Sequence, residues 1–202
     1  MTDYFALLNE PWRPWLEPEA LKTKFLKLAA TIHPDRKHNS SEAEKTAANR
    51  SYAELNAAFN CLADPKSRLL HLLELELGTK PSDVQQIPSA LADLFAEVAI
   101  TCRNTDAFLA EKNKATAPLL QVQFFERGRE WTERLRGLQT KLAGTQDKLI
   151  EELKSLDTQW IAKPEAGERT SLLNRLEELY RLFGYFKRWN NQIQERIVQL
   201  SL

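Results

Sequence analysis

Apolar residues in the first 80 positions recur every three or four residues, which is the spacing of one face of an α-helix. Two such stripes follow one another: Leu21, Phe25, Leu28 and Ile32, then Ala48, Tyr52, Leu55, Phe59 and Leu62. Two amphipathic helices joined by a short turn pack antiparallel and bury their stripes against each other. The pattern therefore predicts a helical hairpin between about residues 18 and 63.

Local signals predict where these helices begin and end. Pro18 suits the first position of a helix, where its missing N–H costs nothing. Pro34 cannot continue the helix and pushes His33 out of helical geometry. Ser41 and Glu44 have the spacing of a capping box. We also expect a short helix over residues 4–8 and another that follows "ADP" and ends at Gly78.

The second half of the chain predicts three more helical stretches, over about 89–113, 119–161 and 168 to the end. The last of these carries apolar residues at heptad spacing: Leu172, Leu176, Leu179, Phe183, Phe186, Ile193, Ile197 and Leu200. A seam of this kind is typical of coiled-coil packing. The segment "AKPEAGE" is long enough to reverse the chain between the last two helices. We therefore expect a long antiparallel, coiled-coil-like hairpin within a C-terminal three-helix bundle.

Composition supports an all-α fold, because glycine is scarce and good helix formers such as Leu, Ala, Glu, Lys and Gln dominate. The segment "GTKPSDVQQIP" is polar and contains a glycine and two prolines, which is typical of a domain boundary. We therefore expect an N-terminal domain over 1–78, a linker over 79–88 and a helical bundle over 89–202. The separate apolar stripes predict that the first domain folds alone.

The charge balance and the cysteine content narrow the range of functions that the protein can have. The chain has 28 basic and 28 acidic residues, so no global attraction to nucleic acid or to an anionic membrane is expected. No apolar stretch is long enough to span a bilayer, and the N-terminus lacks a basic region leading into an apolar run. Cys61 and Cys102 form no C-x-x-C pair, which fits a reducing compartment. A cytoplasmic protein is expected.

The stretch "FLKLAATIHPDR", a polar loop and then "YAELNAAFNCLADPKSR" resemble a J domain, the DnaJ-type co-chaperone module. The match extends over roughly residues 4–77. The tripeptide His33-Pro34-Asp35 corresponds to the family signature, and the two amphipathic helices flank it in the right order. The resemblance implies that the protein docks on a DnaK-type heat-shock chaperone in its ATP state and stimulates ATP hydrolysis.

The resemblance also implies which residues dock. Asp35, exposed at the end of a rigid hairpin, would pair with an arginine of the chaperone. Five basic residues would steer the hairpin toward an acidic surface. The expected chaperone-binding set is His33, Pro34, Asp35, Lys22, Lys24, Lys27, Arg36 and Lys37. We expect His33 and Asp35 to be exposed.

The overall layout is similar to the J-type co-chaperone of iron–sulfur cluster assembly, whose C-terminal bundle presents the cluster scaffold protein. The chain has neither a Gly/Phe-rich linker nor a zinc-binding cysteine repeat, and "MTDYFALLNEP" and "RLLHLLEL" are similar to that group. The resemblance implies an iron–sulfur scaffold protein as the client. The expected client-binding residues are Leu91, Leu94, Phe95 and Val98, while core packing is the alternative for each.

Catalytic and metal-binding patterns are absent from the sequence. There is no Ser/His/Asp arrangement, P-loop or glycine-rich dinucleotide turn, so we expect neither a cofactor nor an enzyme. His38 and His71 lack metal-ligand spacing with either cysteine, and a structural role is expected for them. The alternative function is a helical adaptor that keeps a J-like fold without coupling to a chaperone.

Overall fold

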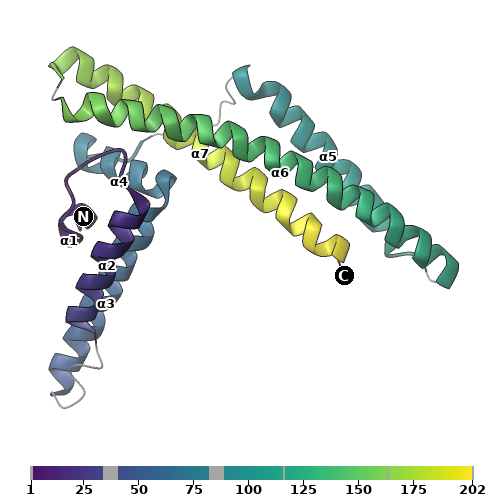
Figure 1. The fold of residues 1–202 in the computed structure, drawn as a ribbon, viewed down its shortest axis with the longest axis horizontal. Coiled ribbons are helices and arrows are strands. Elements are labelled where there is room, and N and C mark those ends of the chain that lie inside the picture. Colours follow the sequence, from purple (N-terminus) through teal and green to yellow (C-terminus); the bar gives the residue numbers. More distant parts are fainter. Residues whose placement is uncertain (1, 34–40, 82–88, 116, 163, 202) are drawn as a thin grey trace. The chain divides into compact units, whose positions relative to one another are not determined.

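The structure is a computed structural model that describes residues 2–33, 41–81, 89–115, 117–162 and 164–201. Within these ranges all regular structure is helical, which confirms the expected all-α fold (Figure 1). The elements are α1 (Tyr4–Leu7), α2 (Pro18–Ile32), α3 (Glu42–Ala63), α4 (Pro65–Leu77), a 3-10 turn η2 (Ser89–Leu91), α5 (Ala92–Lys112), α6 (Pro118–Ile161) and α7 (Ala166–Ser201). Across the described part of the chain, no helix is long and apolar enough to cross a membrane.

The helix ends follow the local signals of the sequence. The Ser41 hydroxyl accepts the Glu44 N–H at 3.3 Å, and the Glu44 carboxylate accepts the Ser41 N–H at 2.9 Å, which completes the expected capping box. Asp64 caps α4 by accepting the Ser67 N–H at 3.0 Å. Gly78 ends α4 with a φ of 67°, a left-handed conformation that glycine adopts without steric cost.

Helices α2 and α3 lie side by side and run antiparallel, as the two apolar stripes predict (Figure 1). Phe25 stacks on Phe59, with ring centroids 4.3 Å apart and an interplanar angle of 18°. Leu21 is buried toward the α4 end of the hairpin, and Leu55 is buried between the Phe25–Phe59 pair and the turn. The hairpin therefore has a continuous apolar core along its length.

The chain forms two compact units, and their limits differ from the expected boundaries. The first unit comprises Met1–Ser82 together with Ile150–Leu182, and the second comprises Asp83–Leu149 together with Phe183–Leu202. The end of α6 and the start of α7 thus pack with the N-terminal helices instead of with the rest of the C-terminal bundle. The composition of the 79–88 segment gave no sign of this sharing.

The physical reason lies in the strap, which we define as the proline-rich residues 9–17 between α1 and α2. Arg13 donates through Nε and a terminal nitrogen to both carboxylate oxygens of Asp157 in α6. The Trp15 N–H donates to the same carboxylate at 3.2 Å, and the Trp160 indole donates to the Trp12 carbonyl at 2.8 Å. The strap is therefore fastened to the last turns of α6 by specific hydrogen bonds.

A second set of contacts joins α4 to the start of α7 in the same unit. Arg169 donates to Glu76 at 2.7 Å, and its guanidinium lies over the Trp160 ring, 4.2 Å from the centroid. Guanidinium groups stack well on indole faces. The first compact unit therefore holds α6 and α7 from both the strap and α4.

The second unit is a helical bundle made of α5, α6 up to residue 149 and α7 from residue 183. All residues of the expected α7 seam are buried along the whole helix, which confirms the seam. In the second unit Tyr185 and Trp189 are buried as well, because α7 packs on two neighbours. Phe95 of α5 lies 6.2 Å from Trp189 between ring centroids.

Candidate functional site

The candidate site is the end of the α2–α3 hairpin, where α2 stops at Ile32. His33 caps the helix with φ −58° and ψ 131°, an extended conformation. A residue before proline is driven out of the helical region by a clash with the proline ring, so Pro34 explains this ending. The backbone therefore turns away from the direction of α2 at His33.

The His33 side chain is held by α3. Its ring meets the Tyr52 ring edge to face, with centroids 5.2 Å apart and an interplanar angle of 74°. This is a favoured arrangement for aromatic pairs. His33 is half-buried, whereas the sequence predicted an exposed residue. The difference arises because Tyr52, assigned to the core stripe by its spacing, packs against the imidazole.

Pro34, Asp35, Arg36 and Lys37 were expected beside His33. They lie in 34–40, outside the described residues, as does His38. The geometry of the site therefore rests on His33 and on the two helices that lead into and out of the turn.

The three lysines of α2 have different surroundings. Lys24 forms an ion pair with Glu10 at 2.5 Å and donates to the Asn9 carbonyl at 3.0 Å, so it fastens the strap to α2. Lys22 and Lys27 are exposed. Leu26 lies among them with 55% of its surface exposed. The exposed face of α2 thus combines two cations with an aliphatic side chain.

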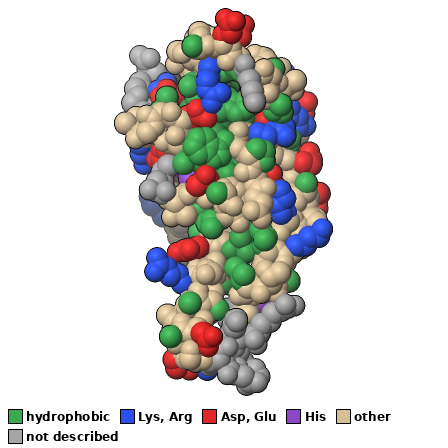
Figure 2. All heavy atoms as spheres, turned by 90° about the vertical axis from the view of Figure 1, so that its left-hand side faces the viewer, with side chains coloured by type: hydrophobic (Ala, Val, Ile, Leu, Met, Phe, Trp, Pro, Cys, Tyr) green, Lys and Arg blue, Asp and Glu red, His purple; other side chains and the backbone are tan. Residues whose placement is uncertain are grey.

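Charge on the protein surface is mixed. Figure 2 shows one face of the molecule, on which basic, acidic and hydrophobic side chains are interspersed. This agrees with the net charge of zero. Any electrostatic steering by the α2 lysines is therefore local.

Arg68, at the start of α4, is buried with 2% of its surface exposed. It donates to the Pro14 carbonyl at 2.8 Å and to the Leu62 carbonyl at 2.6 Å, and it lies over the Trp15 ring. Burial lowers the pKa of its guanidinium to about 10, while Asp64 opposes this shift. The group remains charged at neutral pH and ties the strap to the end of α3.

His71 of α4 is structural, as expected. Its Nε2 accepts the Tyr4 N–H at 3.0 Å, which requires a neutral ring with its proton on the other nitrogen. Burial lowers the pKa of His71, with smaller opposing effects from Asp3 and Glu74. The imidazole thus anchors α1 to α4.

The expected client-binding residues separate into two groups. Leu91, Leu94 and Val98 are buried, with 9%, 8% and 2% of their surfaces exposed. Phe95 is 41% exposed, and Ile100, further along α5, is 56% exposed. Of the expected set, only Phe95 therefore presents substantial apolar surface to solvent.

No group of three or more His, Cys, Asp and Glu side chains in the described residues is placed to hold a metal ion. The sequence reasoning missed the part played by Arg13 and Asp157. A signal was available: Asp157 falls between Leu153 and Trp160 in the apolar stripe of α6, where a carboxylate requires a partner.

Comparison with known proteins places this geometry in context. Residues 3–71 match the family model described as "DnaJ domain". The fold is similar to the crystal structure of human co-chaperone protein HscB, with a TM-score of 0.59 and 18% identity; the alignment covers 96% of this chain and 81% of that one. It is also similar to chaperone HscB from Vibrio cholerae, with a TM-score of 0.58, 19% identity and 96% of both chains covered.

Proposed function

Because residues 3–71 are a J domain carried on an HscB-like helical fold, we propose that this protein is a co-chaperone of a DnaK-type heat-shock chaperone. In this proposal the J domain docks on the chaperone in its ATP state and stimulates ATP hydrolysis. The protein itself catalyses no reaction. The observation that carries the proposal is His33, held by Tyr52 at the proline-terminated end of the α2–α3 hairpin.

The docking surface would combine this turn with the exposed face of α2. Asp35 would pair with an arginine of the chaperone, because a carboxylate and a guanidinium form two parallel charge-assisted hydrogen bonds. Pro34 would set the direction of the turn. Lys22, Lys27, Arg36 and Lys37 would steer it toward an acidic surface. Lys24 supports the surface indirectly, since its ammonium is engaged by Glu10.

Single-turnover ATP hydrolysis by a DnaK-type chaperone, with and without this protein, tests the proposal. Wild type should accelerate hydrolysis, and His33→Gln or Asp35→Asn should abolish the acceleration. The double variant Lys22→Gln/Lys27→Gln should weaken it mainly at low salt, because steering by exposed charges is screened. Lys148→Gln, an exposed lysine of α6 in the second unit, is the matched control.

A protein that leaves the ATPase rate unchanged in all forms would contradict the co-chaperone proposal. It would favour the helical adaptor without chaperone coupling. Circular dichroism on each variant separates lost docking from lost folding.

The proposed client is an iron–sulfur cluster scaffold protein, in line with the similarity to HscB. The exposed α5 residues Phe95 and Ile100 are the proposed contacts, while Leu91, Leu94 and Val98 hold the helix in place. Retention of the scaffold protein on immobilised wild type, and its loss with Phe95→Ala/Ile100→Ala, is the expected result. The exposed pair Asp93→Ala/Asn104→Ala is the control. Failure of wild type to retain the scaffold would exclude this client and leave the ATPase proposal standing.

A further inference from the structure

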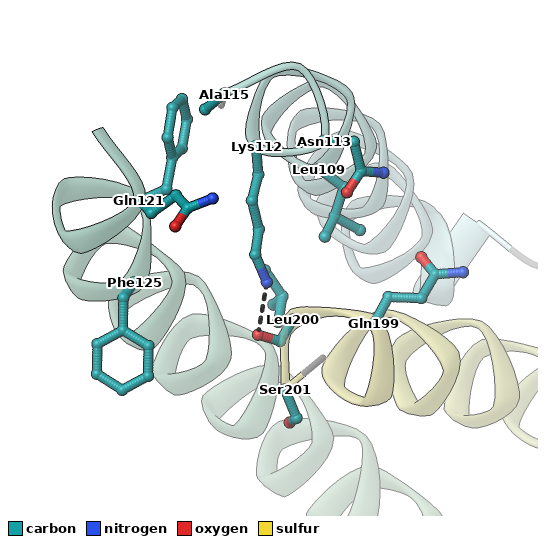
Figure 3. A pocket seen from close by; sticks show the side chains of 10 residues that line it. Leu109, Lys112, Asn113, Ala115, Gln121, Phe125, Gln199, Leu200 and Ser201 are labelled. Atoms are coloured by element: carbon teal, nitrogen blue, oxygen red, sulfur yellow. Dashed lines mark hydrogen bonds between the residues drawn. The ribbon is translucent and has the colours of Figure 1, made fainter. Parts of the chain in front are cut away.

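A hollow of about 790 Å³ opens in the second compact unit where α5 ends, α6 begins and α7 ends (Figure 3). Leu109, Phe124 and Leu200 provide apolar walls. The other lining side chains include neutral polar groups such as Gln121 and Gln199. Lys112 carries the sole charge among the described residues that line it.

Lys112 extends from the last turn of α5 across the hollow toward α7 (Figure 3). Its ammonium donates to the Leu200 carbonyl at 3.2 Å. An ammonium has three donors, and this bond uses one of them. The remaining donors can bind an oxygen of a ligand in the hollow without breaking the link between α5 and α7.

The apolar wall continues outside the hollow along the first turns of α6. Phe125, which lines the hollow, is 68% exposed, and Val122, one turn earlier, is 59% exposed. Leu120 is 45% exposed. Clustered exposure of large apolar side chains is typical of binding surfaces. The apolar surface that an occupant would cover therefore extends along α6 beyond the hollow.

A second positive charge lies beside the hollow. The Arg127 guanidinium stands over the Phe124 ring, 5.4 Å from its centroid, and over the Phe108 ring at 5.1 Å. These stacking contacts hold the cation against the wall. Together with Lys112, it places two cations at the hollow, which favours an occupant that carries a carboxylate.

We propose that this hollow and the adjoining α6 surface bind a peptide segment of a partner protein in which an acidic residue stands among apolar ones. The carboxylate accepts a hydrogen bond from Lys112, and the apolar side chains cover Phe125 and Val122. A peptide fits better than a small amphipathic acid, because the apolar surface runs past the mouth of the hollow. This surface is separate from the J domain and from the Phe95 face, so it does not rest on the proposed function.

Selection from a random twelve-residue displayed peptide library against the full-length protein tests the proposal. The library is first depleted on the Lys112→Gln/Phe125→Ser variant, so that binders to other surfaces are removed. The expected survivors combine Asp or Glu with Leu, Ile or Phe. A synthetic copy of the best survivor should bind about tenfold or more weakly to Lys112→Gln than to wild type, since hydrogen bonds to charged groups contribute about 1.5–3 kcal/mol.

Matched variants keep the test decisive. Lys114→Gln changes an exposed lysine that does not line the hollow, and it should bind the peptide like wild type. Val122→Ser, at a solvent-exposed site, should weaken binding without affecting the fold. No enrichment, survivors without an acidic residue, or equal binding to Lys112→Gln would each overturn the proposal. Binding of decanoate in place of any peptide would overturn the choice of occupant.

Discussion

Asp157 of α6 accepts a hydrogen bond from the backbone N–H of Trp15, a residue 142 positions earlier in the chain. The same carboxylate is paired with Arg13, and it is almost fully buried while Arg13 is partly exposed. The hydrogen bond from Asp157 raises the pKa of the Arg13 guanidinium, which therefore keeps its positive charge. A carboxylate in an apolar stripe thereby becomes the point at which the strap is attached.

Asp157→Asn should destabilise the protein by about 2 kcal/mol, because it leaves the partly buried Arg13 without its counter-ion. Urea unfolding followed by tryptophan fluorescence measures this, since Trp12, Trp15 and Trp160 surround the site. Asp147→Asn, an exposed change on the same helix, should remain within about 0.5 kcal/mol of wild type. Equal stability of both variants would show that the ion pair contributes nothing net.

The Tyr52 ring should be needed for the proposed stimulation of the chaperone's ATP hydrolysis, because it holds His33 in place. Tyr52→Phe keeps the edge-to-face contact with His33 and should stimulate ATP hydrolysis like wild type. Tyr52→Ala removes the contact and should lower the stimulation while the helical content stays unchanged. Stimulation by the alanine variant at the wild-type level would mean that His33 needs no support from α3.

Stability should fall as the pH drops below about 6.5, in part because of His71. Burial lowers its pKa in the folded protein, so the unfolded chain takes up the proton first. The contribution of the neutral ring is therefore complete above the unfolded pKa and is lost as the pH falls toward the folded one. Urea midpoints between pH 7.5 and 5.5 should fall more steeply for wild type than for His71→Gln, which cannot titrate. If the urea midpoints of the two proteins fell equally with pH, His71 would be ruled out as a cause of the pH dependence.

Gly137 and Gly144 lie in the middle of α6, and a Cβ at either position would meet nothing within 4 Å. Gly137→Ala and Gly144→Ala should each stabilise the second unit by about 0.5–1 kcal/mol, since glycine is a poor helix former. Gly78→Ala should instead destabilise by about 1 kcal/mol, because an L-residue resists its φ of 67°. Thermal unfolding should show a higher melting temperature than wild type for Gly137→Ala and Gly144→Ala and a lower one for Gly78→Ala.

Much of the first unit follows from local sequence. Pro18, Pro34 and the Ser41–Glu44 box act within a few residues, and the ends of α2 and the start of α3 were predicted for that reason. The strap could not be predicted in the same way, because Arg13 finds its partner 144 residues away. The positions of Pro34, Asp35, Arg36 and Lys37 in space stay a prediction.

The client residues show another limit of sequence reasoning. Leu91, Leu94, Phe95 and Val98 form a wide apolar arc, and periodicity does not say which edge of such an arc meets the core. The structure buries Leu91, Leu94 and Val98 and leaves Phe95 partly exposed, with its ring 6.2 Å from that of Trp189 in α7. Ile100 is exposed although it is as apolar as the buried residues.

The division of the first unit has a consequence for how the protein is made. On the ribosome, residues 1–82 emerge long before residues 150–182, which complete the same unit. Until α6 has been synthesised, Trp12 and Trp15 lack their contacts with Trp160 and Lys154, and the strap exposes aromatic surface. The packing of the N-terminal helices is therefore completed only after residues 150–182 have been synthesised. The chain thus spends most of its own synthesis with the aromatic surface of the strap uncovered.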